Sequence, residues 1–427
     1  MLSLAGRAGR RTLGTRRLQP QLLWLICTAL LLGVVPLWSL GLQPGDRTPL
    51  PASPVFILLW TIGALCALGA AWQAKYHRLA ALALLSGAGL STCITFTWFS
   101  APDLALTQLS VEAVTTVLIL LGLRWLPRRL EPAETGVQRT ALATARRTRD
   151  LLIAVAAGGG MAALAWAMMS RQFPQSISTF FLERALPEGG GTNVVNVMLV
   201  DFRGFDTFGE IVVLGIVALT VYALLRRFRP ARETLDLPPQ QRALPADLET
   251  DLVNPRLAND TAVGYLMVPA VLMRLVLPLA CMVSVYLFMR GHNEPGGGFV
   301  AGLVMSVALL LQYIVSGTVW VEEHMPLRPR RWIGVGLLTA LATGVGSWFL
   351  GYPFMTTHTA HLTLPLIGEI HIASALFFDI GVFTLVVGST LLVLTALAHQ
   401  SVRSHRFHAR NTDDDDGAAD AVVEGGR

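Results

Sequence analysis

Residues 286–300 read YLFMRGHNEPGGGFV and place a polar, glycine-rich segment between two long apolar stretches. Irregular backbone at membrane depth is tolerated only where protein or a water-filled cavity satisfies its polar groups. A proline stops a helix, and consecutive glycines permit backbone torsions that are closed to other residues. The segment therefore predicts a turn between two membrane helices that is buried against a partner or lines a polar cavity at the outer face. The residues on which this prediction depends are His292, Glu294, Pro295, Gly296, Gly297 and Gly298.

The composition is that of a membrane protein. The chain has 427 residues, of which 53% are hydrophobic and 14% charged, and its mean hydropathy is +0.55. A soluble domain carries about 25% charged residues. We predict an all-α, polytopic membrane protein with about ten transmembrane helices, because ten apolar stretches have the ~20 residues that a helix needs to cross hydrocarbon. These stretches are residues 21–42, 54–73, 79–99, 103–125, 150–170, 206–225, 266–289, 298–320, 332–350 and 371–398.

The distribution of positive charge predicts the orientation of these helices. If the N-terminal segment is cytoplasmic, the cytoplasmic segments hold 27 of the 33 Lys and Arg residues and the outer loops hold five, with Arg274 inside an apolar stretch. Cytoplasmic loops of membrane proteins carry an excess of Lys and Arg. The split predicts that both termini are cytoplasmic. The first apolar stretch is long enough to be a permanent span rather than a cleaved signal peptide.

Glu112 is the most informative polar residue. The helix predicted from about Pro102 places Glu112 ~13 Å from its start, near the middle of a ~30 Å hydrocarbon core. A carboxylate at that depth costs about 2.5–3.5 kcal/mol or more unless it is paired, hydrated or protonated. We interpret it as part of an ion or proton route; the alternative is a protonated Glu that bonds a neighbouring helix. One polar stripe at helical spacing is formed by Gln108, Glu112, Thr115 and Thr116.

Asp103, at the start of the same helix, has two interpretations. Ser100 can cap the helix, and Asp103, three residues later, has the position of the answering residue in a capping box. That interpretation makes Asp103 structural. The other interpretation makes Asp103 a candidate residue of the ion route.

A short segment, residues 201–210, crowds charges at one membrane entrance. Thr207 and Glu210 have the spacing of a capping box, and Arg203 can neutralise one or two carboxylates. Carboxylates that are left over would form a mouth that attracts cations. Two interpretations of this segment stay open: its charges cap and pair with each other, or they form an entrance for ions. Its charged residues are Asp201, Arg203, Asp206 and Glu210.

The last apolar stretch contains a second intramembrane acid, Asp379. On a helix that begins at about residue 371, His371 and Asp379 share one face, and Asp379 lies ~12 Å deep. Histidine titrates near neutral pH, so this pair could pass protons, or it could fix helix packing. Arg274 either snorkels to the cytoplasmic side, which is the interpretation we favour, or pairs in the membrane interior.

Other site classes find no support in the sequence. The four cysteines lie in apolar stretches without a C-x-x-C motif, and His358 and His361 lack a third ligand at suitable spacing, so no metal site or cofactor is predicted. The glycine run lacks the G-K-[ST] end of a nucleotide loop, and no nucleic-acid partner is predicted. Lys75 is the only lysine, so the chain lacks the Lys–Glu relay typical of proton-pumping membrane subunits. The sequence therefore predicts a component of a larger assembly.

At these same residues the chain resembles a known family. APDLALTQLSVEAVTTVLILL (101–121) and VNVMLVDFRGFDTFGEIVVLGIVAL (195–219) are similar to the C-terminal part of the large A subunit of Mrp-type multisubunit cation/proton antiporters. RGHNEPGGGFVAGLV (290–304) and ALFFDIGVFTLVVG (375–388) are similar to the B subunit of those complexes. The resemblance covers about residues 79–225 and 266–398. The many-helix antiporter-like portion of the A subunit is missing, so a separate polypeptide is expected to supply it.

The resemblance implies a non-enzymatic subunit of an exchanger in the bacterial plasma membrane that trades cytoplasmic Na⁺ for external H⁺. It implies the antiporter portion of the A subunit and the C, D, E, F and G-type subunits as partners. The family's intramembrane carboxylate corresponds to Glu112, and its entrance to Asp206 and Glu210. Alternatives are a membrane-arm component of a complex I-like or hydrogenase assembly, and a scaffold whose carboxylates are all caps and pairs.

The chain divides at its polar segments. Residues 229–262 carry five prolines and resemble a tether between membrane modules, and the acidic tail is predicted to be disordered. The predicted parts are two N-terminal helices of unassigned role (1–75), an MbhD-like module (76–145), an MbhE-like module (146–230), a cytoplasmic linker (231–262), a B-subunit-like module of four helices (263–400) and the acidic tail (401–427).

Overall fold

The structure is a computed structural model, and its helices form two compact units. Unit 1 comprises Met1–Ser53 and Leu130–Ser176, and unit 2 comprises Pro54–Arg129 and Ile177–Arg427. The predicted linker at 231–262 lies outside the described residues. The structure describes residues 18–41, 45–48, 51, 53–74, 77–123, 141–172, 176–227, 267–316, 318–325, 327–364 and 368–424.

Unit 1 contains two long helices, α2 (Leu18–Leu40) and α7 (Ala141–Met169). The segment that follows α2 is bound to the end of α7. The backbone N–H of Arg47 donates to the carbonyl of Ser170 at 2.9 Å, and that of Gly45 donates to the Ser170 hydroxyl at 2.9 Å. The bond from Arg47 satisfies a carbonyl at the end of α7, where a helix leaves its last carbonyls unpaired.

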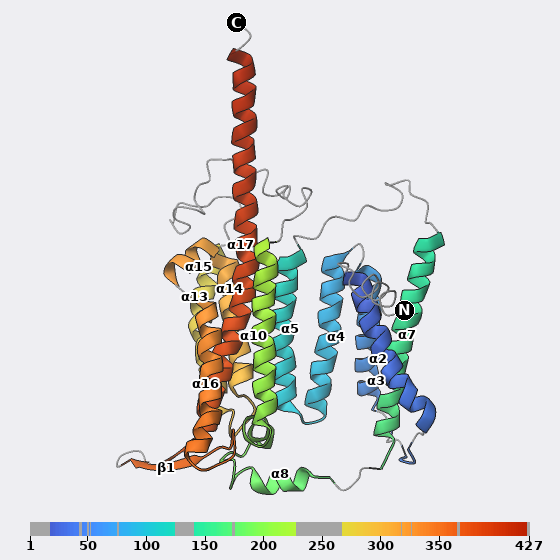
Figure 1. Ribbon diagram of the computed structural model, residues 1–427, viewed down its shortest axis with the longest axis vertical. Helices are drawn as coiled ribbons and strands as arrows, with labels where there is room; N and C mark the ends of the chain where they lie inside the picture. The colour runs from blue at the N-terminus through green and yellow to red at the C-terminus, as the bar shows by residue number, and fades with distance from the viewer. Residues whose placement is uncertain are drawn as a thin grey trace, which may run out of the picture. The chain divides into compact units, whose positions relative to one another are not determined.

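Unit 2 holds the remaining described elements (Figure 1). Its helices pack in a series in which α3 contacts α4, α4 contacts α5, α5 contacts α14, and α10, α14 and α16 all contact α17. The elements are α3 (Pro54–Gln73), α4 (Arg78–Trp98), α5 (Pro102–Leu123), α8 (Ser178–Arg184), α9 (Val194–Val197), the π-helix η1 (Met198–Phe202), α10 (Gly204–Arg227), α13 (Met267–Arg290), α14 (Gly298–Ser316), α15 (Thr318–His324), α16 (Pro329–Phe349), β1 (Thr359–Leu364), β2 (Gly368–Ala373) and α17 (Ala375–Glu424).

The core of unit 2 lies around α14 and α17. Leu385 and Leu391 on α17, Leu310 on α14 and Ile211 on α10 are fully buried. In the 18-residue apolar part of α17, 67% is buried inside the protein, whereas in that of α3 only 11% is buried. A helix that is apolar all round is buried on all sides or faces lipid. Helix α3 therefore lies at the periphery of unit 2, and α17 lies at its centre.

Ten apolar helices correspond to the ten predicted stretches, and their lengths differ. Within the described residues, eight helices are long and apolar enough to cross a membrane. The other two, Gln19–Val35 and Leu275–Arg290, are shorter apolar segments. The prediction of a polytopic helical membrane protein is therefore confirmed, with eight full-length candidate spans rather than ten.

An antiparallel hairpin, β1–β2, departs from the all-α prediction. In its register His361 lies opposite His371, and the last membrane helix begins at Ala375 rather than at 371. The prediction that His371 shares a helical face with Asp379 is therefore wrong. Apolar residues alternate with polar ones in GEIHIA (368–373), which is the period of a strand and not of a helix.

The acidic C-terminal segment is helical, because α17 continues to Glu424. The disorder that its charge predicts is therefore not observed. Adding residues to an existing helix needs no new nucleus, and residues 401–424 contain no proline. Continuation of α17 therefore costs less than the isolated composition of this segment suggests.

Two glycines allow α16 and α17 to pack closely, and this contact is testable. A Cβ atom on Gly336 would lie 2.6 Å from the Gly381 carbonyl oxygen and 2.8 Å from the Cβ of Leu385. Gly336→Ala should destabilise the protein by about 1–3 kcal/mol through overpacking, and thermal unfolding in detergent should show a lower Tm. Gly334→Ala on the same helix is the matched control, since no described atom lies within 4 Å of its added Cβ. Equal Tm values for the two variants would contradict this packing.

Candidate functional site

The glycine-rich turn, defined here as residues 291–297, joins α13 to α14 by folding back on itself. The N–H of Gly297 donates to the carbonyl of Leu287 at 3.0 Å. Gly297 has φ +98°, and a Cβ on Gly291 would lie 2.1 Å from the Gly297 nitrogen. Only glycine fits such a backbone at low cost. Gly291 and Gly297 are thus explained by the turn that the sequence predicts here.

Asn193 is the residue that holds this turn in place. Its side-chain NH₂ donates to the carbonyls of Gly291 (3.1 Å) and Glu294 (3.0 Å), and its oxygen accepts the N–H of Val195 and Asn196 as the N-cap of α9. Its backbone N–H donates to the carbonyl of His292 at 3.2 Å. The side chain is buried. One amide therefore satisfies polar groups of two different chain segments at once.

Asp103 contacts the same turn from α5. Its carboxylate accepts the N–H of Gly296 at 2.9 Å and the NH₂ of Asn193 at 3.3 Å. Ser100 precedes the helix by two residues and has φ +56°, so the predicted capping box with Ser100 does not form. The Asp103 carboxylate instead binds a backbone N–H that lies 193 residues away in the sequence.

His292 points from the turn towards the segment before α9. Its Nε2 lies 2.9 Å from the carbonyl oxygen of Gly189, and its Nδ1 lies 3.4 Å from the side-chain oxygen of Asn196. Burial lowers the pKa of His292, while the Gly189 carbonyl and the charge of Asp201 oppose that shift. Glu294 differs, because it is exposed and pairs with Arg290 at 2.8 Å.

Asp379 lies behind the turn, on the first turns of α17. It is 7% exposed and accepts hydrogen bonds from the backbone of Gly298 and the side chain of Asn196. A Cβ on Gly298 would lie 2.4 Å from the carbonyl oxygen of Asp379. The start of α14, the α9 segment and α17 therefore meet at this one buried carboxylate.

Glu112 lies elsewhere, between α5 and α4. A Cβ on Gly89 of α4 would lie 2.2 Å from Glu112 Oε2, so the carboxylate occupies the space that this glycine leaves. The Gln108 amide donates to Oε2 at 3.4 Å, and the hydroxyls of Thr116 and Ser86 bond at 2.8 Å. Thr115 is exposed and bonds its own helix backbone, so it is not part of this polar seam.

The charges of residues 201–210 separate into three environments. Asp201 accepts the N–H of Thr357 at 2.6 Å, whereas Arg203 and Asp206 form an exposed ion pair at 2.5 Å. Glu210 is exposed on α10. The predicted capping box of Thr207 with Glu210 does not form, because α10 begins at Gly204 and the Thr207 hydroxyl donates to Leu199.

Two predicted residues are not brought to these sites by described contacts. His371 lies in β2, and Arg274 lies in α13; the side chains of both fall outside the described part of the chain. Sequence reasoning in turn missed Asn193 and Asn196. Their signal was an asparagine pair at i and i+3 within the apolar run NVVNVMLV.

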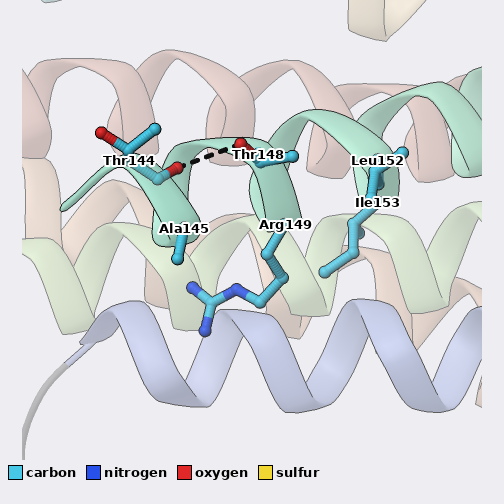
Figure 2. A pocket seen from close by; sticks show the side chains of 6 residues that line it. All are labelled: Thr144, Ala145, Thr148, Arg149, Leu152 and Ile153. Carbon is cyan, nitrogen blue, oxygen red and sulfur yellow. Dashed lines mark hydrogen bonds between the residues drawn. The ribbon is translucent and has the colours of Figure 1, made fainter. Parts of the chain in front are cut away.

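A shallow pocket on α7 does not qualify as a site. Figure 2 shows that its six lining residues follow one another on a single helix, with a hydrogen bond from the Thr148 hydroxyl to the Thr144 carbonyl. Binding sites are typically concave with polar groups that converge from several elements. The lining residues are Thr144, Ala145, Thr148, Arg149, Leu152 and Ile153.

Three family models match consecutive parts of the chain. They are MbhD, the D subunit of MBH, over residues 62–128, MbhE, the E subunit of MBH, over 145–242, and MnhB, "Domain related to MnhB subunit of Na+/H+ antiporter", over 268–392. Among solved structures, one chain of the Mrp complex from Dietzia sp. DQ12-45-1b matches with a TM-score of 0.74 and 27% identity, over 93% of this chain and 40% of that chain.

The B subunit of the Na⁺/H⁺ antiporter of Bacillus subtilis (strain 168) is 38% identical over 127 residues, which are 30% of this chain and 89% of that protein. The chain belongs to the Mrp-type antiporter family. A second Mrp-type relative, the probable K⁺/H⁺ antiporter A/B subunit of Rhizobium meliloti (strain 1021), is 56% identical over 93% of this chain. The chain spans 40% of that protein's length. The resemblance read from the sequence is thereby confirmed.

The role of Asn193 in this Mrp-type chain is testable by Asn193→Asp. A carboxylate cannot donate, so the carbonyls of Gly291 and Glu294 would lose their partner and Asp103 would face a like charge. We expect a loss of about 3 kcal/mol or more in stability, seen as a lower Tm in detergent. Asn293→Asp is the control, since its oxygen only accepts from Thr192 and the residue is exposed. Equal losses in the two variants would contradict the assigned role.

The partly buried carboxylate of Asp201 should make the stability of the protein depend on pH. Burial raises the pKa of Asp201 above its ordinary value of 3.8, against the hydrogen bond from Thr357 and the charge of His292. At a pH between the ordinary pKa and the raised pKa of the folded protein, Asp201 holds a proton that the unfolded chain releases. This contribution to stability therefore falls as pH rises from about 4. Asp201→Asn keeps an acceptor for Thr357 and should lack this fall. Parallel thermal unfolding from about pH 4 to 8 checks it; identical pH profiles would contradict it.

Proposed function

We propose that this chain supplies part of the cation route of an Mrp-type antiporter that exchanges cytoplasmic Na⁺ for external H⁺. In this proposal Glu112 is the carboxylate at which cation and proton compete. It is supported by the seam between α4 and α5, where Glu112 is half-buried and the Gln108 amide approaches it at a long 3.4 Å. Among the described residues, no cationic side chain pairs with it. A carboxylate so weakly bound within a span retains capacity to bind an ion.

The other carboxylates support this choice by contrast. Asp103 is bound by a backbone N–H and an amide, and Asp206 by Arg203. Hydrogen bonds to charged groups contribute about 1.5–3 kcal/mol, so a cation would have to displace the partners of Asp103. Asp206 is neutralised by Arg203 in an exposed ion pair, which contributes about 0–1 kcal/mol. Glu210, exposed on α10, stays a candidate for cation entry.

The proposal also specifies which cation is exchanged, Na⁺ or K⁺. The Bacillus subtilis relative is named for Na⁺ and the Rhizobium meliloti relative for K⁺. A hydrated carboxylate binds either monovalent cation, and Glu112 by itself does not discriminate between them. We retain Na⁺ as the proposed cation and measure K⁺ beside it.

The proposal includes an orientation and partners. With both termini cytoplasmic, the glycine-rich turn faces the outside, as the excess of Lys and Arg in the predicted cytoplasmic segments supports. The partners proposed are the antiporter portion of the A subunit and the C to G-type subunits. The membrane-arm alternative draws on the two MBH descriptions, but the MnhB-related match over 268–392 favours the antiporter.

Glu112→Gln tests the proposal in the assembled complex. The amide removes the titratable group with little change of shape, so initial rates of Na⁺/H⁺ exchange in proteoliposomes should fall about tenfold or more, with unchanged assembly by gel filtration. Potassium is measured in the same vesicles. Thr115→Val is the matched control, because Thr115 is exposed on the same helix and bonds only its own backbone among described contacts. Unchanged exchange in Glu112→Gln would remove Glu112 from the route.

A further inference from the structure

The side-chain amide of Asn196 lies between two titratable groups. Its oxygen lies 3.4 Å from Nδ1 of His292, and its NH₂ donates to the carboxylate of Asp379. Asn196 and Asp379 are each 7% exposed. The three side chains therefore form a continuous row from the glycine-rich turn to the buried start of α17.

The donors and acceptors of this row are satisfied when the imidazole is charged. The Gly189 carbonyl, 2.9 Å from Nε2, only accepts, so Nε2 must carry a hydrogen. With the Asn196 oxygen towards the imidazole, Nδ1 carries a hydrogen too, because that oxygen only accepts. The amide cannot be reversed in this state, because an ionised Asp379 needs the NH₂. The observed arrangement therefore matches an imidazolium at His292 and a carboxylate at Asp379.

A second arrangement satisfies the same atoms with the same number of protons. If the Asn196 amide turns by 180°, its NH₂ donates to the bare Nδ1 of a neutral imidazole. Its oxygen then accepts the O–H of a protonated Asp379. Between the two arrangements the N–H bond at Nδ1 breaks and an O–H bond at Asp379 forms, with water as the carrier. Imidazolium and carboxylate become imidazole and carboxylic acid, so charge and atoms balance.

We propose that His292, Asn196 and Asp379 bind one proton between them, and that the orientation of the Asn196 amide determines which end holds it. This proton site belongs to the B-subunit-like module and its α9 neighbour. It is separate from the proposed cation route at Glu112 and does not depend on it.

The charged groups around the row act on His292 more directly than on Asp379. Asp201 of η1 favours the imidazolium, and Glu188 acts in turn on Asp201. Asp103 accepts a hydrogen bond from Asn193, and Glu294 of the turn pairs with Arg290 at the end of α13. Burial of His292 opposes the imidazolium, and the charge of Asp201 favours it.

The titration of His292 tests the proposal. The purified complex, labelled with ¹⁵N-histidine, is titrated by NMR, and His292→Gln assigns the signal. Asp379→Asn removes the carboxylate that balances the imidazolium, so the His292 midpoint should fall by about one pH unit or more. In an Asn196→Leu background the same substitution should leave the midpoint unchanged, because the bridge is gone. His358→Gln, an exposed histidine, is the control and should not move the His292 midpoint.

Two results would overturn the proposal. An equal shift in both backgrounds would mean that the charge of Asp379 acts directly and not through the amide. An unchanged midpoint in Asp379→Asn alone would mean that no proton is shared, whatever the Asn196 variants do. Asn196→Ala replaces Asn196→Leu if the larger side chain prevents folding. Since the readout is a titration and not transport, its failure is distinct from failure of the proposed ion route.

Discussion

A turn between two membrane helices must find partners for its backbone N–H and C=O groups, because lipid offers none. In this chain the constraint acts on residues 291–297, and its solution organises one end of unit 2. Asp103 accepts the N–H of Gly296, and the side chain of Asn193 donates to the carbonyls of Gly291 and Glu294. These partners come from α5 and from the segment before α9. Satisfying one short turn thus aligns three distant stretches of sequence.

The same constraint separates carboxylates that look alike in the sequence. Asp103 and Glu112 are nine residues apart on α5, yet Asp103 is bound by a backbone N–H and an amide, and Glu112 has an amide at 3.4 Å. A well-bound carboxylate is part of the scaffold, and a loosely bound one is free to exchange partners. The distinction depends on which chain segments approach α5, and depth in the membrane alone does not reveal it.

Local sequence predicted the features that depend on length and composition. The apolar stretches predicted the helices, and the glycine run predicted the turn, because both follow from the solvent and from backbone sterics. Capping boxes were predicted at Ser100 and Thr207 and do not form, since that spacing also occurs where the residue binds a distant partner. The hairpin at 359–373 was missed because hydrophobicity outweighed its alternating pattern. Asn193 was missed because an asparagine among apolar residues reveals no partner until the chain is folded.

The contacts of the glycine-rich turn cross boundaries between modules. Asp103 lies in the part matched by the MbhD model, Asn193 in the MbhE part and Gly296 in the MnhB-related part. A protein made of the MnhB-related part alone must find these donors and acceptors on another polypeptide. Carrying all three parts on one chain converts that encounter into an intramolecular one, with an effective concentration set by the tether and not by expression level. Covalent fusion thus guarantees equal numbers of the three parts, and dilution cannot separate them.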